Sequence, residues 1–143
     1  MIGSVHVALG AALGNRIKNK PLAFIAGFAS HLLGDAVPHY DMGLTELPLM
    51  FGTLAFIIQK HGWNSPQFFG AAGAVLPDLE HIPAELRKDP RRHEPMDEKL
   101  FPTHNNRVPH GKWPLGQEPF GILMNIVLYL GGLYLAGLLE RSK

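Results

Sequence analysis

Apolar residues occur along this chain in runs of helical length, and proline, glycine and charged residues separate the runs. No run alternates apolar and polar residues in the way that a half-buried strand does. We therefore expect an all-α protein, folded as a compact bundle of about five hydrophobic helices. The predicted helices cover residues 2–14, 21–36, 45–59, 66–77 and 119–139.

The stretch between the fourth and fifth runs has a different character. Residues 84–118 are charged, rich in proline and without apolar periodicity, which predicts a long polar loop. Long ordered loops of this kind are often functional. A chain of 143 residues is long enough to bury a core and fits one domain. We divide that domain into metal-binding helices (1–83), the polar loop (84–118) and a hydrophobic C-terminal helix (119–140).

The last apolar run is the clearest. "FGILMNIVLYLGGLYLAGLL", Phe120 to Leu139, has no charged residue, and Asn125 is its only amide. As a helix it would be about 30 Å long, which matches the hydrocarbon core of a bilayer. A central helix of a soluble bundle would show the same pattern. Because only 17% of the residues are charged, against about a quarter in typical soluble domains, we expect a transmembrane helix and membrane lipids as partners.

Composition restricts the chemistry. A formal charge of +1 argues against a nucleic-acid partner that is bound through a basic surface. With no cysteine, the chain has no disulfide and no thiolate ligand. Eight histidines are many for this length. Any bound metal must be held by imidazole nitrogen and carboxylate oxygen, which suits zinc, manganese, iron or nickel.

The segment "SHLLGDAVPHYD" places polar residues where a buried helix is predicted. His31 and Asp35 are four residues apart, so their side chains project from one face of that helix. His39 and Asp41 follow after the helix, where the chain can turn back. Burying such groups without partners costs several kcal/mol. Two explanations remain open: a shared metal ion, or an ordinary buried hydrogen bond between His31 and Asp35.

Two further polar clusters and the isolated His6 near the N-terminus add to this set. "LPDLEH" contains a carboxylate and an imidazole three residues apart, although Asp78 would also serve as a helix cap. "THNNRVPHG" would be a solvated loop if it stood alone. Taken together, the clusters offer enough ligands for one or two zinc-like ions. The candidate metal ligands are His6, His31, Asp35, His39, Asp41, Asp78, His81, His104 and His110.

Three segments also resemble a known family. "VHVALGAALG", "SHLLGDAVPHYD" and "GAVLPDLEH" are similar to motifs of bacterial membrane-bound metal-dependent hydrolases of the YdjM type, themselves distantly similar to zinc-dependent phospholipase C. The resemblance implies a location at the bacterial inner (cytoplasmic) membrane. It implies that the residues at the motif positions are metal ligands. Five residues match these positions closely, and His39 and Asp41 match them more loosely. The five residues are His6, His31, Asp35, Asp78 and His81.

From these features we expect a membrane-associated, metal-dependent hydrolase that acts on a phosphoester or lipid-like substrate through a metal-activated water. Asp35, Glu80 and Arg107 are the candidate catalytic residues, with Arg107 placed to neutralise a phosphate. The alternative is a non-enzymatic membrane protein in which the His and Asp clusters form a structural metal site. The sequence does not separate these two functions, because structural and catalytic sites use the same ligands.

Overall fold

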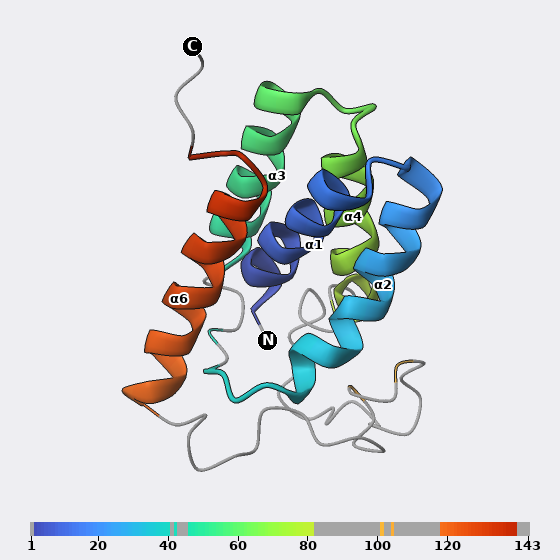
Figure 1. Ribbon diagram of the computed structural model, residues 1–143. Helices are drawn as coiled ribbons and strands as arrows, with labels where there is room; N and C mark the ends of the chain where they lie inside the picture. The colour runs from blue at the N-terminus through green and yellow to red at the C-terminus, as the bar shows by residue number, and fades with distance from the viewer. Residues whose placement is uncertain are drawn as a thin grey trace.

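The computed structural model describes residues 2–40, 42, 46–81, 101, 104 and 118–139. These residues form helices, and no strand occurs among them, as the sequence predicts. Figure 1 shows the helices packed side by side in one bundle. In chain order they are α1 (Gly3–Ile17), α2 (Lys20–Ala36), α3 (Leu47–His61), α4 (Pro66–Val75), the 3-10 helix η2 (Leu76–His81) and α6 (Phe120–Leu135).

Helix α1 is the centre of the bundle, since it contacts α2, α3, α4 and α6. An apolar residue or glycine occupies most of its positions, and ten of its residues are buried. A helix that is apolar all round is typical of the interior of a protein. Its start is held by the carboxylate of Glu46, which accepts the backbone N–H groups of Gly3 (2.9 Å) and Ser4 (3.1 Å). These donors have no partner within a helix, and a carboxylate there also interacts favourably with the helix dipole.

The helix boundaries follow local signals that the periodicity only approximates. Asn19 caps α2 by accepting from the backbone N–H of Leu22, and Ser65 caps α4 by accepting from Phe68. The first helix continues three residues beyond its predicted end, to a left-handed residue at Lys18. The predicted fourth helix also changes, because its last turn tightens into the 3-10 helix η2.

Glycines let α1, α2 and α4 approach one another at backbone distance. A Cβ atom on Gly70 of α4 would lie 2.1 Å from the carbonyl oxygen of Gly10 on α1. A Cβ atom on Gly27 of α2 would lie 2.1 Å from the carbonyl oxygen of Gly70. Side chains of any size are therefore excluded from these crossings. This close packing sets the short separation between α1 and α2 on which the site described below depends.

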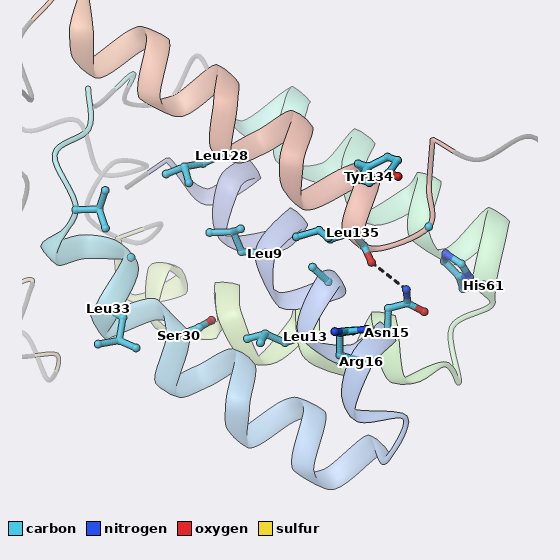
Figure 2. Close-up of a pocket in the computed structure, with 14 residues that line it drawn as sticks. Leu9, Leu13, Asn15, Arg16, Ser30, Leu33, His61, Leu128, Tyr134 and Leu135 are labelled. Carbon is cyan, nitrogen blue, oxygen red and sulfur yellow. Dashed lines mark hydrogen bonds between the residues drawn. The ribbon is translucent and has the colours of Figure 1, made fainter.

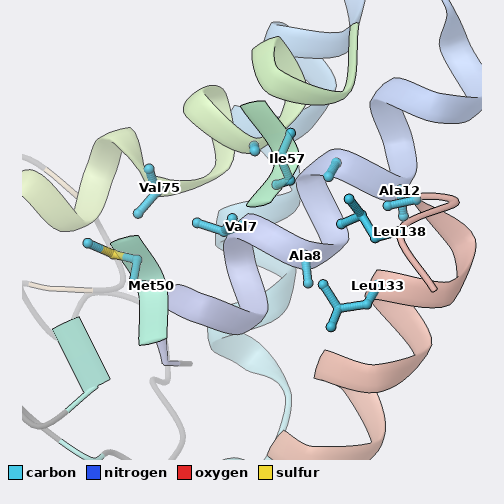
Figure 3. Close-up of a cluster of buried hydrophobic side chains, with 11 residues drawn as sticks. Val7, Ala8, Ala12, Met50, Ile57, Val75, Leu133 and Leu138 are labelled. Carbon is cyan, nitrogen blue, oxygen red and sulfur yellow. The ribbon is translucent and has the colours of Figure 1, made fainter. Parts of the chain in front are cut away.

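The apolar core lies between α1 and the helices on its other sides (Figure 3). Val7 and Ala8 of α1 belong to the same cluster as Ile57 of α3, Val75 of α4 and Leu133 of α6. Most members are small, so the stability of the bundle depends on close contact between helix backbones more than on large side chains.

The C-terminal helix is shorter than predicted. Helix α6 ends at Leu135 rather than Leu139, and the chain turns at Gly137, whose φ of 73° is a left-handed conformation that favours glycine. Sixteen residues give a helix of about 24 Å. In the part of the chain that the structure describes, we find no helix with both the length and the apolar character that crossing a bilayer requires. The predicted transmembrane helix is therefore not found.

One face of α6 is buried and the other is exposed. Gly132 packs against Ala8 of α1, and Leu133 is buried in the core. Leu123, Val127 and Leu130 point away from the bundle and are each at least half exposed. Helix α6 is thus neither a free span nor a fully buried central helix, the two alternatives that its sequence suggests.

Candidate metal centre

Six polar side chains from distant parts of the sequence meet at one end of the bundle. They are close to the start of α1 and the end of α2, which Figure 1 shows at the same end of the molecule. Helix η2 and the isolated residue His104 complete the group. We call this group the His–Asp cluster; its members are His6, His31, Asp35, Asp78, Glu80 and His104.

His31 and Asp35 are next to each other, as their four-residue spacing predicts. The Nε2 atom of His31 lies 3.1 Å from Oδ2 of Asp35, and both side chains are buried. Asp35 also contacts His104, whose Nε2 lies 3.5 Å from the same oxygen. The Oδ2 atom of Asp35 is therefore shared between two imidazoles from different parts of the chain.

His6 reaches the cluster from α1. Its Nε2 donates to Oδ1 of Asp35 over 3.1 Å, because a carboxylate can only accept. Its ring is stacked on that of His31, with 4.1 Å between centroids. Burial lowers the pKa of His6 from 6.5 to about 3, although its hydrogen bond with Asp35 acts in the opposite direction. His6 is consequently neutral at physiological pH.

The orientation of His31 is set by α4. Its Nδ1 lies 2.9 Å from the carbonyl oxygen of Ala74, which is an acceptor, so Nδ1 carries the proton. In neutral His31 the lone pair is therefore on Nε2, and it points into the cluster. An imidazole whose second nitrogen donates to a carbonyl is the usual form of a metal-binding histidine.

His104 is oriented in the same manner by a carboxylate. Its Nδ1 contacts Oε1 of Glu80, while its Nε2 lies 3.2 Å from Nε2 of His31. Burial lowers the pKa of His104, but hydrogen bonds with Asp35 and Glu80 and the charges of Asp35 and Asp78 outweigh it, and the pKa is raised overall. Its Nε2 therefore faces the same position as Nε2 of His31.

Asp78 lies at the more open side of the cluster. Its Oδ1 is 3.8 Å from Nε2 of both His31 and His104, and its side chain is 20% exposed. Burial raises the pKa of Asp78 to about 6, although the neighbouring His31 acts against this. Its Oδ2 is buried, and no described residue gives it a hydrogen bond. A buried carboxylate oxygen without a donor is unfavourable unless a cation compensates it.

These observations test whether a metal ion fits. Two groups of side chains offer ligand atoms that all lie within 4.8 Å of one another: His6, His31 and Asp78, and His31, Asp35 and His104. Imidazole nitrogen and carboxylate oxygen form a donor set that zinc and other divalent transition metals accept. The cluster also contains three carboxyl groups, those of Asp35, Asp78 and Glu80, whose negative charge a divalent cation would offset. The residues present therefore fit a divalent metal ion.

The remaining predicted site residues are placed differently. His39 is buried, and its Nδ1 donates to the carbonyl oxygen of Val37 over 2.7 Å, but it belongs to neither group. The backbone of His81 ends η2, and its side chain lies outside the described residues. Three predicted site residues lie outside them altogether: Asp41, Arg107 and His110. So does most of the predicted polar loop.

Some of the surroundings of the cluster had no sequence signal. The carbonyl of Ala74 orients His31, yet every residue has a backbone carbonyl, so no pattern marks this one. Phe101 lies against both His31 and His104, with 5.7 Å between ring centroids in each case. Phe28 in turn packs on Phe101. These rings shield the imidazoles from water, which strengthens the electrostatic interactions among them.

Comparisons with protein-family models, with curated proteins and with solved structures found no match to this chain.

Proposed function

We propose that this protein is a metal-dependent hydrolase whose divalent ion, zinc or a similar metal, is held by His31, Asp35 and His104. The observation that supports this most strongly is the arrangement of the two imidazoles. The Nε2 atoms of His31 and His104 lie 3.2 Å apart beside a carboxylate, while each Nδ1 is already bonded to an acceptor. Both Nε2 atoms therefore face one position, as two ligands of a single cation must.

Each residue of the cluster has a role in this proposal. A bound divalent ion would supply Lewis acidity, which polarises an ester oxygen and acidifies a water. Glu80 accepts a hydrogen bond from Nδ1–H of His104 and thereby orients that ring. Asp78 is the candidate general base, because its pKa of about 6 is close to neutrality and its side chain is partly open to solvent. His6 keeps Asp35 in place through its hydrogen bond.

A phosphoester or lipid-like substrate at the bacterial inner membrane is the proposed target. The motifs resemble those of membrane-bound metal-dependent hydrolases, and the described helices expose many apolar side chains. Ile25 on α2, Phe51 on α3 and Val127 on α6 are each more than half exposed. Apolar surface of this extent is typical of proteins that contact a lipid or another protein. We therefore propose that the exposed apolar side chains of these helices associate with the membrane surface.

A structural metal site in a non-enzymatic membrane protein is the second candidate. It is favoured by burial, since His6, His31, Asp35 and His104 are all at most 5% exposed. Structural sites are closed to solvent, whereas catalytic sites keep a position for water. The partial exposure of Asp78 favours the catalytic function.

Metal analysis combined with an activity assay tests the proposal. Purified full-length protein is reconstituted with zinc, its metal content is measured by mass spectrometry, and hydrolysis of bis(p-nitrophenyl) phosphate and of phospholipid vesicles is followed. We expect one or two zinc ions per chain, and loss of both metal and activity in His31→Ala and Asp35→Ala. His61→Ala is the matched control, because His61 is at the far end of α3 and outside both ligand groups.

The two candidate functions give different results. Stoichiometric zinc without hydrolysis of either substrate would support the structural site and contradict the enzyme. Wild-type protein that does not retain zinc above the level of His31→Ala would contradict both.

A further inference from the structure

An open apolar groove lies along α1, on the side where α2 and α6 flank it. Its volume is about 860 Å³, within the range of about 300–1,000 Å³ that small-molecule sites occupy. Figure 2 shows Leu9 and Leu13 of α1 on its floor, Leu33 of α2 on one wall, and Leu128 and Leu135 of α6 on the other. Leu33 is 73% exposed, and Leu135 is 56% exposed. The groove thus exposes apolar side chains from three helices, and no described residue covers them.

One end of this groove is polar and positively charged. Asn15 donates to the carbonyl oxygen of Leu135 over 2.9 Å and so links α1 to α6 at that end (Figure 2). Arg16 lines the groove beside Asn15, and its side chain is exposed. None of the ion pairs found among the described residues involves Arg16. Its charge is therefore available to a ligand.

The charges of the described residues are separated along the bundle. The basic side chains are at the end where α1 and α3 finish and α2 begins; they are Arg16, Lys18, Lys20 and Lys60. The acidic side chains are toward the opposite end, where the His–Asp cluster lies; they are Asp35, Glu46, Asp78, Glu80 and Glu118. Among the described residues, those at the Arg16 end of the groove are thus basic, which favours an anion there.

We propose that the groove binds a single-chain anionic amphiphile in monomeric form, such as a long-chain fatty acid. The chain would lie on Leu9, Leu13 and Leu33, where its methylene groups lose contact with water. The anionic head group would lie at Arg16, whose guanidinium makes strong, charge-assisted hydrogen bonds with carboxylates and phosphates. This inference does not rest on the proposed hydrolase, since none of the residues of the His–Asp cluster lines the groove.

Titration calorimetry with three probes of equal chain length tests the proposal. Dodecanoate, dodecanol and dodecyltrimethylammonium are added to the full-length protein, each below the concentration at which it aggregates. We expect dodecanoate to bind with a 1:1 stoichiometry and at least tenfold more tightly than either other probe. Arg16→Gln should weaken dodecanoate binding at least tenfold and leave dodecanol binding unchanged.

Two leucine variants locate the binding site. Leu33→Gln removes an exposed leucine from the groove wall and should weaken dodecanoate binding several-fold. Leu49→Gln is the matched control, because Leu49 is an exposed leucine on α3 outside the groove, and it should have no effect. Leu13→Trp fills the groove floor and should abolish binding.

Three results would overturn the inference. They are equal binding of the cationic and anionic probes, equal weakening by Leu33→Gln and Leu49→Gln, and a dimer in solution that Leu33→Gln dissociates. The first would remove the role of Arg16, and the second would indicate unspecific adsorption to apolar surface. The third would show that a second copy of the chain covers the groove. Circular dichroism of each variant verifies that these surface substitutions leave the helices folded.

Discussion

Replacing Glu80 separates the contribution of a residue that orients a ligand from that of a ligand. Glu80 accepts a hydrogen bond from Nδ1–H of His104, and it belongs to neither group of candidate metal ligands. Glu80→Ala removes this acceptor and leaves His31, Asp35 and His104 in the chain. Glu80→Gln keeps an acceptor oxygen of nearly the same shape and removes the charge.

The size of the effect follows from this geometry. Loss of a partner that orients a metal-binding histidine typically lowers metal affinity about 10–100-fold, or roughly 1.4–2.7 kcal/mol. We expect Glu80→Ala to lower the metal affinity by an amount in that range, and Glu80→Gln to lower it by less. His31→Ala should lower the metal affinity far more, because it removes a nitrogen ligand and leaves the neighbouring polar groups without this partner in a buried site.

Competition with a chromophoric chelator measures the zinc affinity of each variant, and bis(p-nitrophenyl) phosphate measures its activity. Zinc affinity in Glu80→Ala equal to that of wild type would refute the orienting role. A loss as large as that of His31→Ala would identify Glu80 as a ligand. Unchanged affinity with lost activity would instead place Glu80 in the chemical step, the catalytic role that its sequence position suggested.

Three further predictions concern the metal-free protein, and chemical denaturation in the presence of a chelator measures each one. Because burial raises the pKa of Asp78 from 3.8 to about 6, the charge of its carboxylate opposes folding at neutral pH. Asp78→Asn should therefore stabilise the folded protein by up to about 3 kcal/mol at pH 7, and this gain should vanish below pH 3.8. No gain at pH 7 would contradict the raised pKa. Because folding lowers the pKa of His6 from 6.5 to about 3, the unfolded chain binds a proton on His6 at a higher pH than the folded protein does. The free energy of unfolding should therefore fall by at most about 5 kcal/mol as the pH falls from 6.5 toward 3. His6→Gln should flatten this dependence on pH. Gly70→Ala should destabilise the bundle, since its Cβ would lie 2.1 Å from the carbonyl oxygen of Gly10. Gly131→Ala, whose Cβ meets nothing within 4 Å, should instead stabilise α6 by about 0.5–1 kcal/mol. Equal effects of the two substitutions would refute the close crossing.

The two pKa shifts act in opposite directions over a shared interval. Between about pH 4 and pH 6 the folded protein holds the proton on Asp78 that the unfolded chain has released, while the unfolded chain holds the proton on His6 that the folded protein excludes. The slopes largely cancel there. Only the single variants at Asp78 and His6 separate the two contributions, which is why each is measured against wild type over the whole pH range.

The sequence by itself determined the helices and one pair of neighbours. Apolar periodicity, prolines at first turns and glycines after helices are local signals, and each acts within a few residues of where it occurs. The four-residue spacing of His31 and Asp35 is local in the same sense, and a helical turn brings these side chains together wherever the helix packs. The all-α class and the central pair of the site were therefore predictable.

Tertiary structure decided which of the other polar residues join that pair. His104 would be a solvated loop residue from its own surroundings in the sequence, yet its Nε2 lies 3.2 Å from that of His31. His39 is much nearer to His31 along the chain and belongs to neither ligand group. The same holds for the end of α6, where the chain turns at Gly137 while the apolar run continues. Such outcomes depend on contacts between residues far apart in the chain, above all the close crossings of α1, α2 and α4, and periodicity within one segment carries no information about them.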